Sequence, residues 1–161
     1  MAGQVIVVDD EAAIREAAPQ WLELSGFSVQ TCATAVQALA LLDGDFPGVL
    51  ISDVRMPGTD GLQLLERVVE LDRDLPVIMI TGHGDVPMAV QALKRGAYDF
   101  IEKPFTPDRL LDTVRRALEK RRLVCENRAL RQRFALKDGI AAKLLGVSRP
   151  MERLRRQILD L

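Results

Sequence analysis

The chain has 161 residues and a formal net charge of −1, which hides an acidic segment of net −9 (residues 1–106, 7 basic and 16 acidic side chains) ahead of a basic segment of net +6 (residues 107–137, 10 basic and 4 acidic). The length and the 48% hydrophobic content fit one folded domain with an appendage, while two cysteines and one histidine exclude a disulfide framework and a zinc site. No apolar run reaches the roughly 18–20 residues of a membrane span and no signal peptide is visible, so we expect a cytoplasmic protein without a membrane partner.

Short apolar runs alternate with helical patterns along the acidic segment. The expected strands are residues 5–8, 28–32, 49–52, 76–80 and 98–101. The expected helices cover residues 11–25, 34–43, 62–69 and 86–95. A further helix begins at Pro107, with Thr106 as its N-cap. This alternation predicts an α/β fold: a flavodoxin-like (βα)5 doubly wound parallel sheet with strand order 2-1-3-4-5 and a long C-terminal helix.

Polar side chains follow four of the expected strands at the point where each strand ends. Asp9 and Asp10 follow the first strand, Asp53 the third, Thr81 the fourth and Lys103 the fifth. An aspartate at one strand end is often only a turn or cap residue. Because the carboxyl ends of parallel strands meet at one edge of the sheet, four such signals together predict a shared site.

The residue types at this edge favour phosphoryl-transfer chemistry. Carboxylates held close together repel one another, and a hard cation such as Mg²⁺, which prefers oxygen ligands, relieves the repulsion. A lysine ammonium is a point charge suited to phosphate, and a threonine hydroxyl is a hydrogen-bond donor. An aspartate nucleophile completes a set in which positioning and charge neutralisation dominate.

Four segments carry a family resemblance. VVDDE (7–11), SDVRMPGTDG (52–61), TGHGDVPMAV (81–90) and DFIEKPF (99–105) resemble, in this order, the receiver domain of two-component response regulators. The resemblance extends from residue 4 to about residue 120. It implies a phospho-acceptor switch, not an enzyme, with a sensor histidine kinase as the phosphoryl donor.

The same resemblance implies a role for each polar residue of the edge. Asp53 is the phospho-acceptor. Asp10, Asp53 and the backbone carbonyl of Arg55 ligate Mg²⁺, and Asp9 acts through water or as a further acidic contact.

Three further residues complete the implied switch. Thr81 and Lys103 bind the phosphoryl oxygens, and Phe100 is the aromatic switch residue that moves inward as Thr81 shifts. We expect Tyr98, two residues before Phe100, to point to the same face of the sheet.

The basic segment predicts a linker. The helix from Pro107 is expected to end at Asp138-Gly139, about 31 residues and roughly 46 Å long. Residues 1–120 are expected to form the receiver and 121–139 a coiled-coil linker that forms a homodimer. The expected seam has 4-3-4 spacing and consists of Leu123, Asn127, Leu130 and Phe134. The alternative use of this arginine-rich helix is a nucleic-acid patch.

Residues 140–161 have two interpretations. The segment LLGVSRPMERLRRQI (144–158) resembles the start of the AAA+ ATPase domain of NtrC-type, sigma-54-dependent activators. The segment AAKLLGVSRP (141–150) also resembles a DNA-binding helix-turn-helix, but Glu152 and Arg155 would then occupy core positions. No G-x-x-x-x-G-K motif is present, so we expect the ATP site to lie outside this chain.

The favoured hypothesis is a receiver that controls a sigma-54-dependent AAA+ domain through dimer and linker rearrangement. Sigma-54 RNA polymerase and DNA are then partners of domains outside this chain. Within the family, the motifs look most like those of regulators of C4-dicarboxylate transport. The alternatives are a receiver with a helix-turn-helix output and a phosphatase of the haloacid-dehalogenase type. The phosphatase needs a second aspartate at the position of Arg55.

Overall fold

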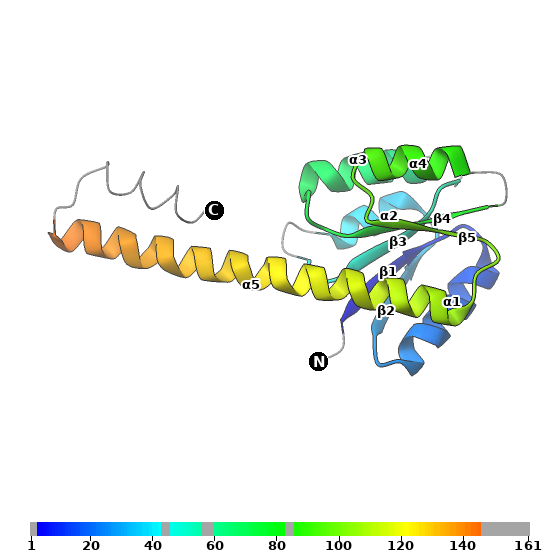
Figure 1. The fold of residues 1–161 in the computed structure, drawn as a ribbon, viewed down its shortest axis with the longest axis horizontal. Coiled ribbons are helices and arrows are strands. Elements are labelled where there is room, and N and C mark those ends of the chain that lie inside the picture. Colours follow the sequence, from blue (N-terminus) through cyan, green and yellow to red (C-terminus); the bar gives the residue numbers. More distant parts are fainter. Residues whose placement is uncertain (1–2, 43–45, 56–59, 83–85, 146–161) are drawn as a thin grey trace. The chain divides into compact units, whose positions relative to one another are not determined.

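The computed structural model describes residues 3–42, 46–55, 60–82 and 86–145, with side chains as far as Phe134. Five strands form one parallel sheet in the order β2-β1-β3-β4-β5 (Figure 1). The strands are β1 (Gln4–Val8), β2 (Ser28–Cys32), β3 (Val49–Asp53), β4 (Val77–Thr81) and β5 (Asp99–Glu102). The predicted flavodoxin-like architecture and strand order are confirmed.

Five helices connect and extend the strands. They are α1 (Ala12–Leu24), α2 (Ala35–Leu41), α3 (Gly61–Leu71), α4 (Val86–Lys94) and α5 (Pro107–Leu145). Side-chain caps fix several helix starts, because the first N–H groups of a helix have no partner within it. The Thr106 hydroxyl accepts a hydrogen bond from the Arg109 N–H at 3.2 Å, as predicted. Asp60 and Gln63 form a reciprocal capping box at the start of α3.

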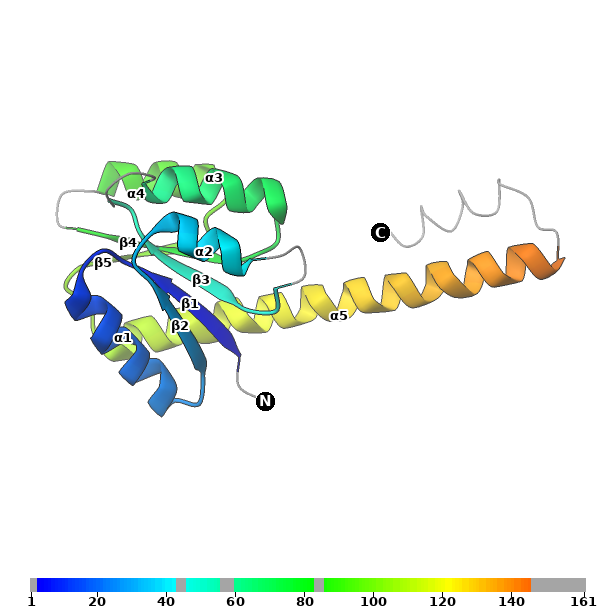
Figure 2. The ribbon, with the colours of Figure 1, turned by 180° about the vertical axis from the view of Figure 1, so that it is seen from behind.

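Two apolar cores lie on opposite faces of the sheet, as expected for a parallel sheet covered on both sides. One face packs against α2, α3 and α4, and the other packs against α1 and the first part of α5 (Figures 1 and 2). Strands β3 and β4 are buried along their whole length. On the second face, Trp21 of α1 packs edge-to-face on Phe105, with ring centroids 6.0 Å apart.

Helix α5 differs from its predicted extent. It continues to Leu145, so the end predicted at Asp138-Gly139 was wrong. A single glycine inside a helix costs only about 1 kcal/mol, and the residues after Gly139 include the good helix formers alanine, lysine and leucine. The chain divides into two compact units, residues 1–122 and 123–161. Residues 56–58, His83 and most of the AAA+-like segment lie outside the described residues.

Candidate functional site

The polar residues predicted to share one edge of the sheet do meet there. Asp9 directly follows β1, Asp53 ends β3, Thr81 ends β4 and Lys103 directly follows β5. Asp9, Asp10 and Asp53 each offer a carboxylate oxygen, and these oxygens lie within 4.8 Å of one another. The parallel register produces this meeting, because Asp53 is paired with Ile80 and Thr81 with Glu102 in neighbouring strands.

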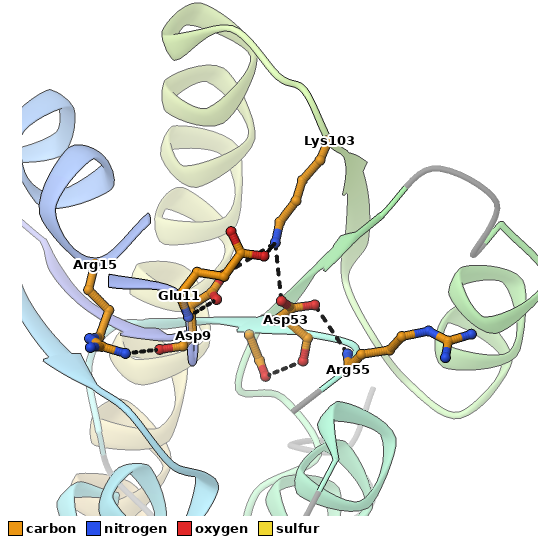
Figure 3. A network of polar contacts seen from close by, with 7 residues as sticks. Asp9, Glu11, Arg15, Asp53, Arg55 and Lys103 are labelled. Carbon is orange, nitrogen blue, oxygen red and sulfur yellow. Dashed lines mark hydrogen bonds and ion pairs between the residues drawn. The ribbon is translucent and has the colours of Figure 1, made fainter. Parts of the chain in front are cut away.

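Lys103 is the cationic centre of the site (Figure 3). Its ammonium lies 3.1 Å from Asp53 Oδ2, 3.2 Å from Glu11 Oε1 and 3.6 Å from Asp9 Oδ2. Burial lowers the pKa of Lys103, but the hydrogen bond to Asp53 and the negative charges of Asp9 and Asp53 outweigh it, so the net shift is upward. The lysine is therefore held in its charged form against three carboxylates.

Asp9 is fully buried and only partly satisfied. Its Oδ1 accepts the Glu11 N–H at 2.9 Å, whereas Oδ2 has no hydrogen-bond partner among the described residues. Burial raises the pKa of Asp9 from 3.8 to about 6; the Glu11 hydrogen bond opposes this shift and the charge of Asp53 adds to it. A buried oxygen with an open lone pair, next to two more carboxylates, fits a hard cation such as Mg²⁺.

Asp53 is buried but keeps a small solvent-exposed area. The residue is 6% exposed, its Oδ1 accepts the Arg55 N–H at 3.1 Å, and its Oδ2 accepts a hydrogen bond from the Lys103 ammonium. Two fixed contacts orient the carboxylate at the end of β3. The remaining exposure leaves it reachable by a group from solvent.

Thr81 is a second buried group with an unused donor. Its hydroxyl is fully buried and has no hydrogen-bond partner in the part of the chain that the structure describes. Its carbonyl accepts the Lys103 N–H at 2.7 Å, which ties the end of β4 to the lysine backbone. A hydroxyl left unpaired beside an acidic group is suited to an incoming oxygen ligand.

Phe100 and Tyr98 lie against different cores. Phe100 packs against the α2–α3–α4 face and Tyr98 against the α1–α5 face. The prediction that both share one sheet face was wrong, because β5 begins only at Asp99 and the two-residue alternation of a strand does not reach Tyr98.

Glu11 was missed by the sequence analysis. Its contact with Lys103 joins residues 92 positions apart, and an acidic residue at a helix start is usually solvated. Arg15 also reaches this region, where its guanidinium donates to the Asp9 carbonyl at 2.8 Å (Figure 3). The only sequence signal for either residue was its proximity to the Asp9-Asp10 pair.

A family model described as the response regulator receiver domain matches residues 5–115. The chain belongs to this family. Receiver domains act by accepting a phosphoryl group from a kinase, and they bind Mg²⁺ at an acidic pocket; here Asp9, Asp10 and Asp53 form such a group. A sensor kinase is accordingly the partner class of this receiver domain.

Curated relatives extend the match beyond the receiver domain. The chain is 54% identical over 158 residues to the C4-dicarboxylate transport transcriptional regulatory protein DctD of Rhizobium meliloti, covering 98% of this chain and 34% of the relative. It is 40% identical over 151 residues to the transcriptional regulatory protein FixJ of Bradyrhizobium diazoefficiens, covering 94% of this chain and 70% of that relative.

A crystal structure of NtrX from Brucella abortus matches with a TM-score of 0.74 and 41% identity, covering 98% of this chain and 34% of that one. The chain thus spans about a third of the length of DctD and of the NtrX chain. None of the described helices is long and apolar enough to cross a membrane.

The predicted linker residues lie in the C-terminal part of α5. Leu123, Leu130 and Phe134 are 53%, 52% and 51% exposed, and Asn127 is exposed as well. The residues of the predicted seam are therefore exposed among the part of the chain that the structure describes.

Proposed function

We propose that this receiver domain is a phosphorylation-driven switch in which Asp53 is the phospho-acceptor. The observation that carries the proposal is the position of the Asp53 carboxylate, which is oriented by the Arg55 N–H and lies 3.1 Å from the Lys103 ammonium. The unpaired Thr81 hydroxyl lies at the end of the neighbouring strand.

In the transfer, an Asp53 oxygen forms a bond to phosphorus while the bond from phosphorus to a nitrogen of the kinase histidine breaks. The histidine nitrogen keeps the electron pair of that bond, so no oxidant or reductant is required. Thr81 and Lys103 act on the transferred group: the hydroxyl donates to one phosphoryl oxygen and the ammonium neutralises another. The Lys103 ammonium already lies 3.1 Å from Asp53 Oδ2 before transfer, and Thr81 shifts toward the phosphoryl group as it binds.

The metal site of this proposal consists of Asp10, Asp53 and the backbone carbonyl of Arg55, with Asp9 acting through water or as a further acidic contact. Two observations support it: Asp9 Oδ2 accepts no hydrogen bond among the described residues, and one carboxylate oxygen from each of the three aspartates lies within 4.8 Å of the others. Bound Mg²⁺ would supply positive charge between the carboxylates and the phosphoryl oxygens. The residues of the chain supply the ligands and their orientation.

The test is labelling with radioactive acetyl phosphate in the presence of Mg²⁺, followed by the same assay with a phosphorylated sensor kinase. We expect Asp53→Asn to lose labelling completely. The matched control is Asp112→Asn, which removes an exposed carboxylate whose partner is Arg116, and it should label like the wild type. Undiminished labelling of Asp53→Asn would contradict the proposal.

The proposed output of the switch is a change in Phe100 and in the linker homodimer. In this proposal Phe100 moves inward as Thr81 shifts toward the phosphoryl group. The open stripe of Leu123, Leu130 and Phe134, with Asn127 between them, supports a coiled-coil seam, because a helix gains little from exposing large apolar side chains.

Sedimentation equilibrium of Leu130→Asp tests the linker homodimer. This variant should dissociate at concentrations where the wild type is dimeric. Leu24→Asp, at an 88% exposed leucine of α1, is the matched control and should leave the dimer intact. A dimeric Leu130→Asp would contradict the seam.

For the whole protein we propose a sigma-54-dependent activator of C4-dicarboxylate transport genes. In this proposal the receiver covers residues 1–120, the linker 121–139, and an AAA+ domain that contacts sigma-54 RNA polymerase begins within 140–161. The 54% identity to DctD supports it. The free cysteines Cys32 and Cys125 fit a cytoplasmic location. Binding of a duplex by residues 107–161 alone would favour the helix-turn-helix alternative instead. The phosphatase alternative is disfavoured by Arg55.

A further inference from the structure

Arg121 of α5 is a charged side chain buried inside the receiver domain. It is a fully buried arginine in a helix that is otherwise rich in exposed basic residues. Its Nε and Nη2 donate to the Phe46 carbonyl at 2.9 and 2.8 Å, and Nη2 also pairs with Asp72 Oδ2 at 2.6 Å. The Asp72 side chain is 2% exposed, so both charges are removed from water.

Asp72 joins this ion pair to the end of α3. It is the C-cap residue of that helix, and its backbone N–H donates to the Val68 carbonyl at 2.7 Å. Its other carboxylate oxygen, Oδ1, accepts the Asp74 N–H at 3.0 Å and orders the turn that follows. One carboxylate therefore ends α3 and holds α5.

The opposite end of α3 lies against the phospho-acceptor. The Gly61 N–H donates to the Val54 carbonyl at 2.9 Å. A Cβ atom on Gly61 would lie only 2.2 Å from the Asp53 carbonyl oxygen, so the helix start packs directly on the backbone of Asp53. Between these ends, α3 has 11 residues, roughly 16 Å, and buries Leu64, Leu65 and Val68 in the core.

The ion pair joins helices on opposite faces of the sheet, at the edge where the amino ends of the strands lie. Helices α3 and α5 cover opposite faces (Figures 1 and 2), and Phe46 and Asp72 precede β3 and β4 respectively. The contact thus lies at the edge opposite to Asp53. Arg121 is two residues before Leu123, where the second compact unit begins.

Stability alone does not account for this pair. Replacing a buried ion pair by apolar residues of similar volume is often neutral or stabilising, and Arg121 Nη1 finds no hydrogen-bond partner among the described residues. A planar guanidinium with three directed hydrogen bonds does fix the rotation of its helix more tightly than an apolar contact would. This is the property that a helix needs if its position carries a signal.

We propose that Asp72 and Arg121 are positioning residues through which α3 transmits the state of the Asp53 site to the start of the linker. A shift of the Asp53 backbone on phosphorylation displaces the α3 start, the helix moves as one body with its apolar face packed in the core, and the Asp72–Arg121 pair passes the displacement to α5. The inference rests on the proposed function of Asp53. It adds a route along α3, separate from the route through Thr81 and Phe100.

The experiment measures amide hydrogen exchange of residues 123–134 in the full chain, with and without Mg²⁺ and beryllofluoride as a mimic of the aspartyl phosphate. The test variant is Asp72→Asn/Arg121→Met, in which Asn keeps an oxygen for the Asp74 N–H and Met keeps the apolar stem. Arg121→Lys is the second variant, because it keeps the charge but loses the planar fork. The matched control is Glu66→Gln/Arg95→Met, which removes an exposed ion pair between α3 and the end of α4.

All variants should accept phosphate from acetyl phosphate at the wild-type rate and keep wild-type exchange protection in β3 and β4. The mimic should change linker exchange in the wild type and in the control. That change should fall at least fivefold in the double variant and by an intermediate factor in Arg121→Lys. A wild-type response in the double variant, or no linker response in a wild type that labels at Asp53, would overturn the inference. Failure of the wild type to label would instead refute the proposed function itself.

Discussion

Replacing Arg121 alone should lower the free energy of unfolding of the receiver far more than replacing its neighbour Arg122. In Arg121→Met the Asp72 carboxylate, 2% exposed, loses the guanidinium that lies 2.6 Å from it, and the Phe46 carbonyl loses two donors. Breaking one side of a buried pair costs about 3–5 kcal/mol, against a total of roughly 6–18 kcal/mol for a domain of this size. At about 3–5 °C per kcal/mol, the melting temperature should fall by roughly 9–25 °C.

The matched control is Arg122→Met. Arg122 is the next residue of α5 and is exposed, with Glu119 as a partner, so its loss should leave the free energy of unfolding close to that of the wild type. The measurement is urea unfolding at pH 7. The wild type, Arg121→Met, Asp72→Asn and the double variant form a double-mutant cycle, and Arg122→Met is measured beside them. The double variant should be less destabilised than the sum of the two single variants by about 2 kcal/mol or more. An Arg121→Met variant within about 1 kcal/mol of Arg122→Met would refute this reasoning.

Three further predictions concern the site itself. Because the folded pKa of Asp9 is raised from 3.8 to about 6, the folded state holds the extra proton, and stability without metal should fall by up to about 3 kcal/mol as pH rises from about 4 to 6. Melting curves in EDTA should show this loss as the difference between wild type and Asp9→Asn; parallel curves would contradict it. Lys103→Met should bind Mg²⁺ roughly tenfold more tightly in calorimetry, because the ammonium lies 3.1 Å from Asp53 and 3.6 Å from Asp9 and repels a cation that these carboxylates would hold. The same variant should be labelled more slowly by acetyl phosphate. Unchanged Mg²⁺ affinity would argue against a shared site. Gly61→Ala should destabilise the domain by about 1–3 kcal/mol or more in urea, because its Cβ would meet the Asp53 carbonyl oxygen at 2.2 Å; a neutral result would show that the start of α3 yields freely.

The sequence was sufficient for the sheet and for the main members of the site. The alternation of apolar runs and helical patterns predicted the strand order, and a parallel sheet necessarily brings Asp9, Asp53, Thr81 and Lys103 to one edge. The positions of these residues follow from the hydrophobic periodicity and from where each strand ends, which are local features of the sequence. They can be predicted without knowing which side chains are in contact.

The features that were missed depend on contacts between distant segments. Arg121 was assigned to the linker range 121–139, and nothing local distinguishes it from Arg122, yet its partners lie 75 and 49 positions away. Glu11 looked like an ordinary acidic helix start. The end of α5 was misplaced because a glycine weakens a helix without always ending it.

The edge-to-face contact between Trp21 and Phe105 has a practical consequence. Phe105 lies two residues beyond Lys103, in the connection that carries the lysine into the site, and Trp21 is the chain's single tryptophan. The tryptophan fluorescence of the chain therefore comes from one indole, which contacts Phe105 in that connection. Any displacement of Lys103 that carries Phe105 with it alters the surroundings of this indole, so the emission spectrum of the unlabelled protein can follow the site in real time.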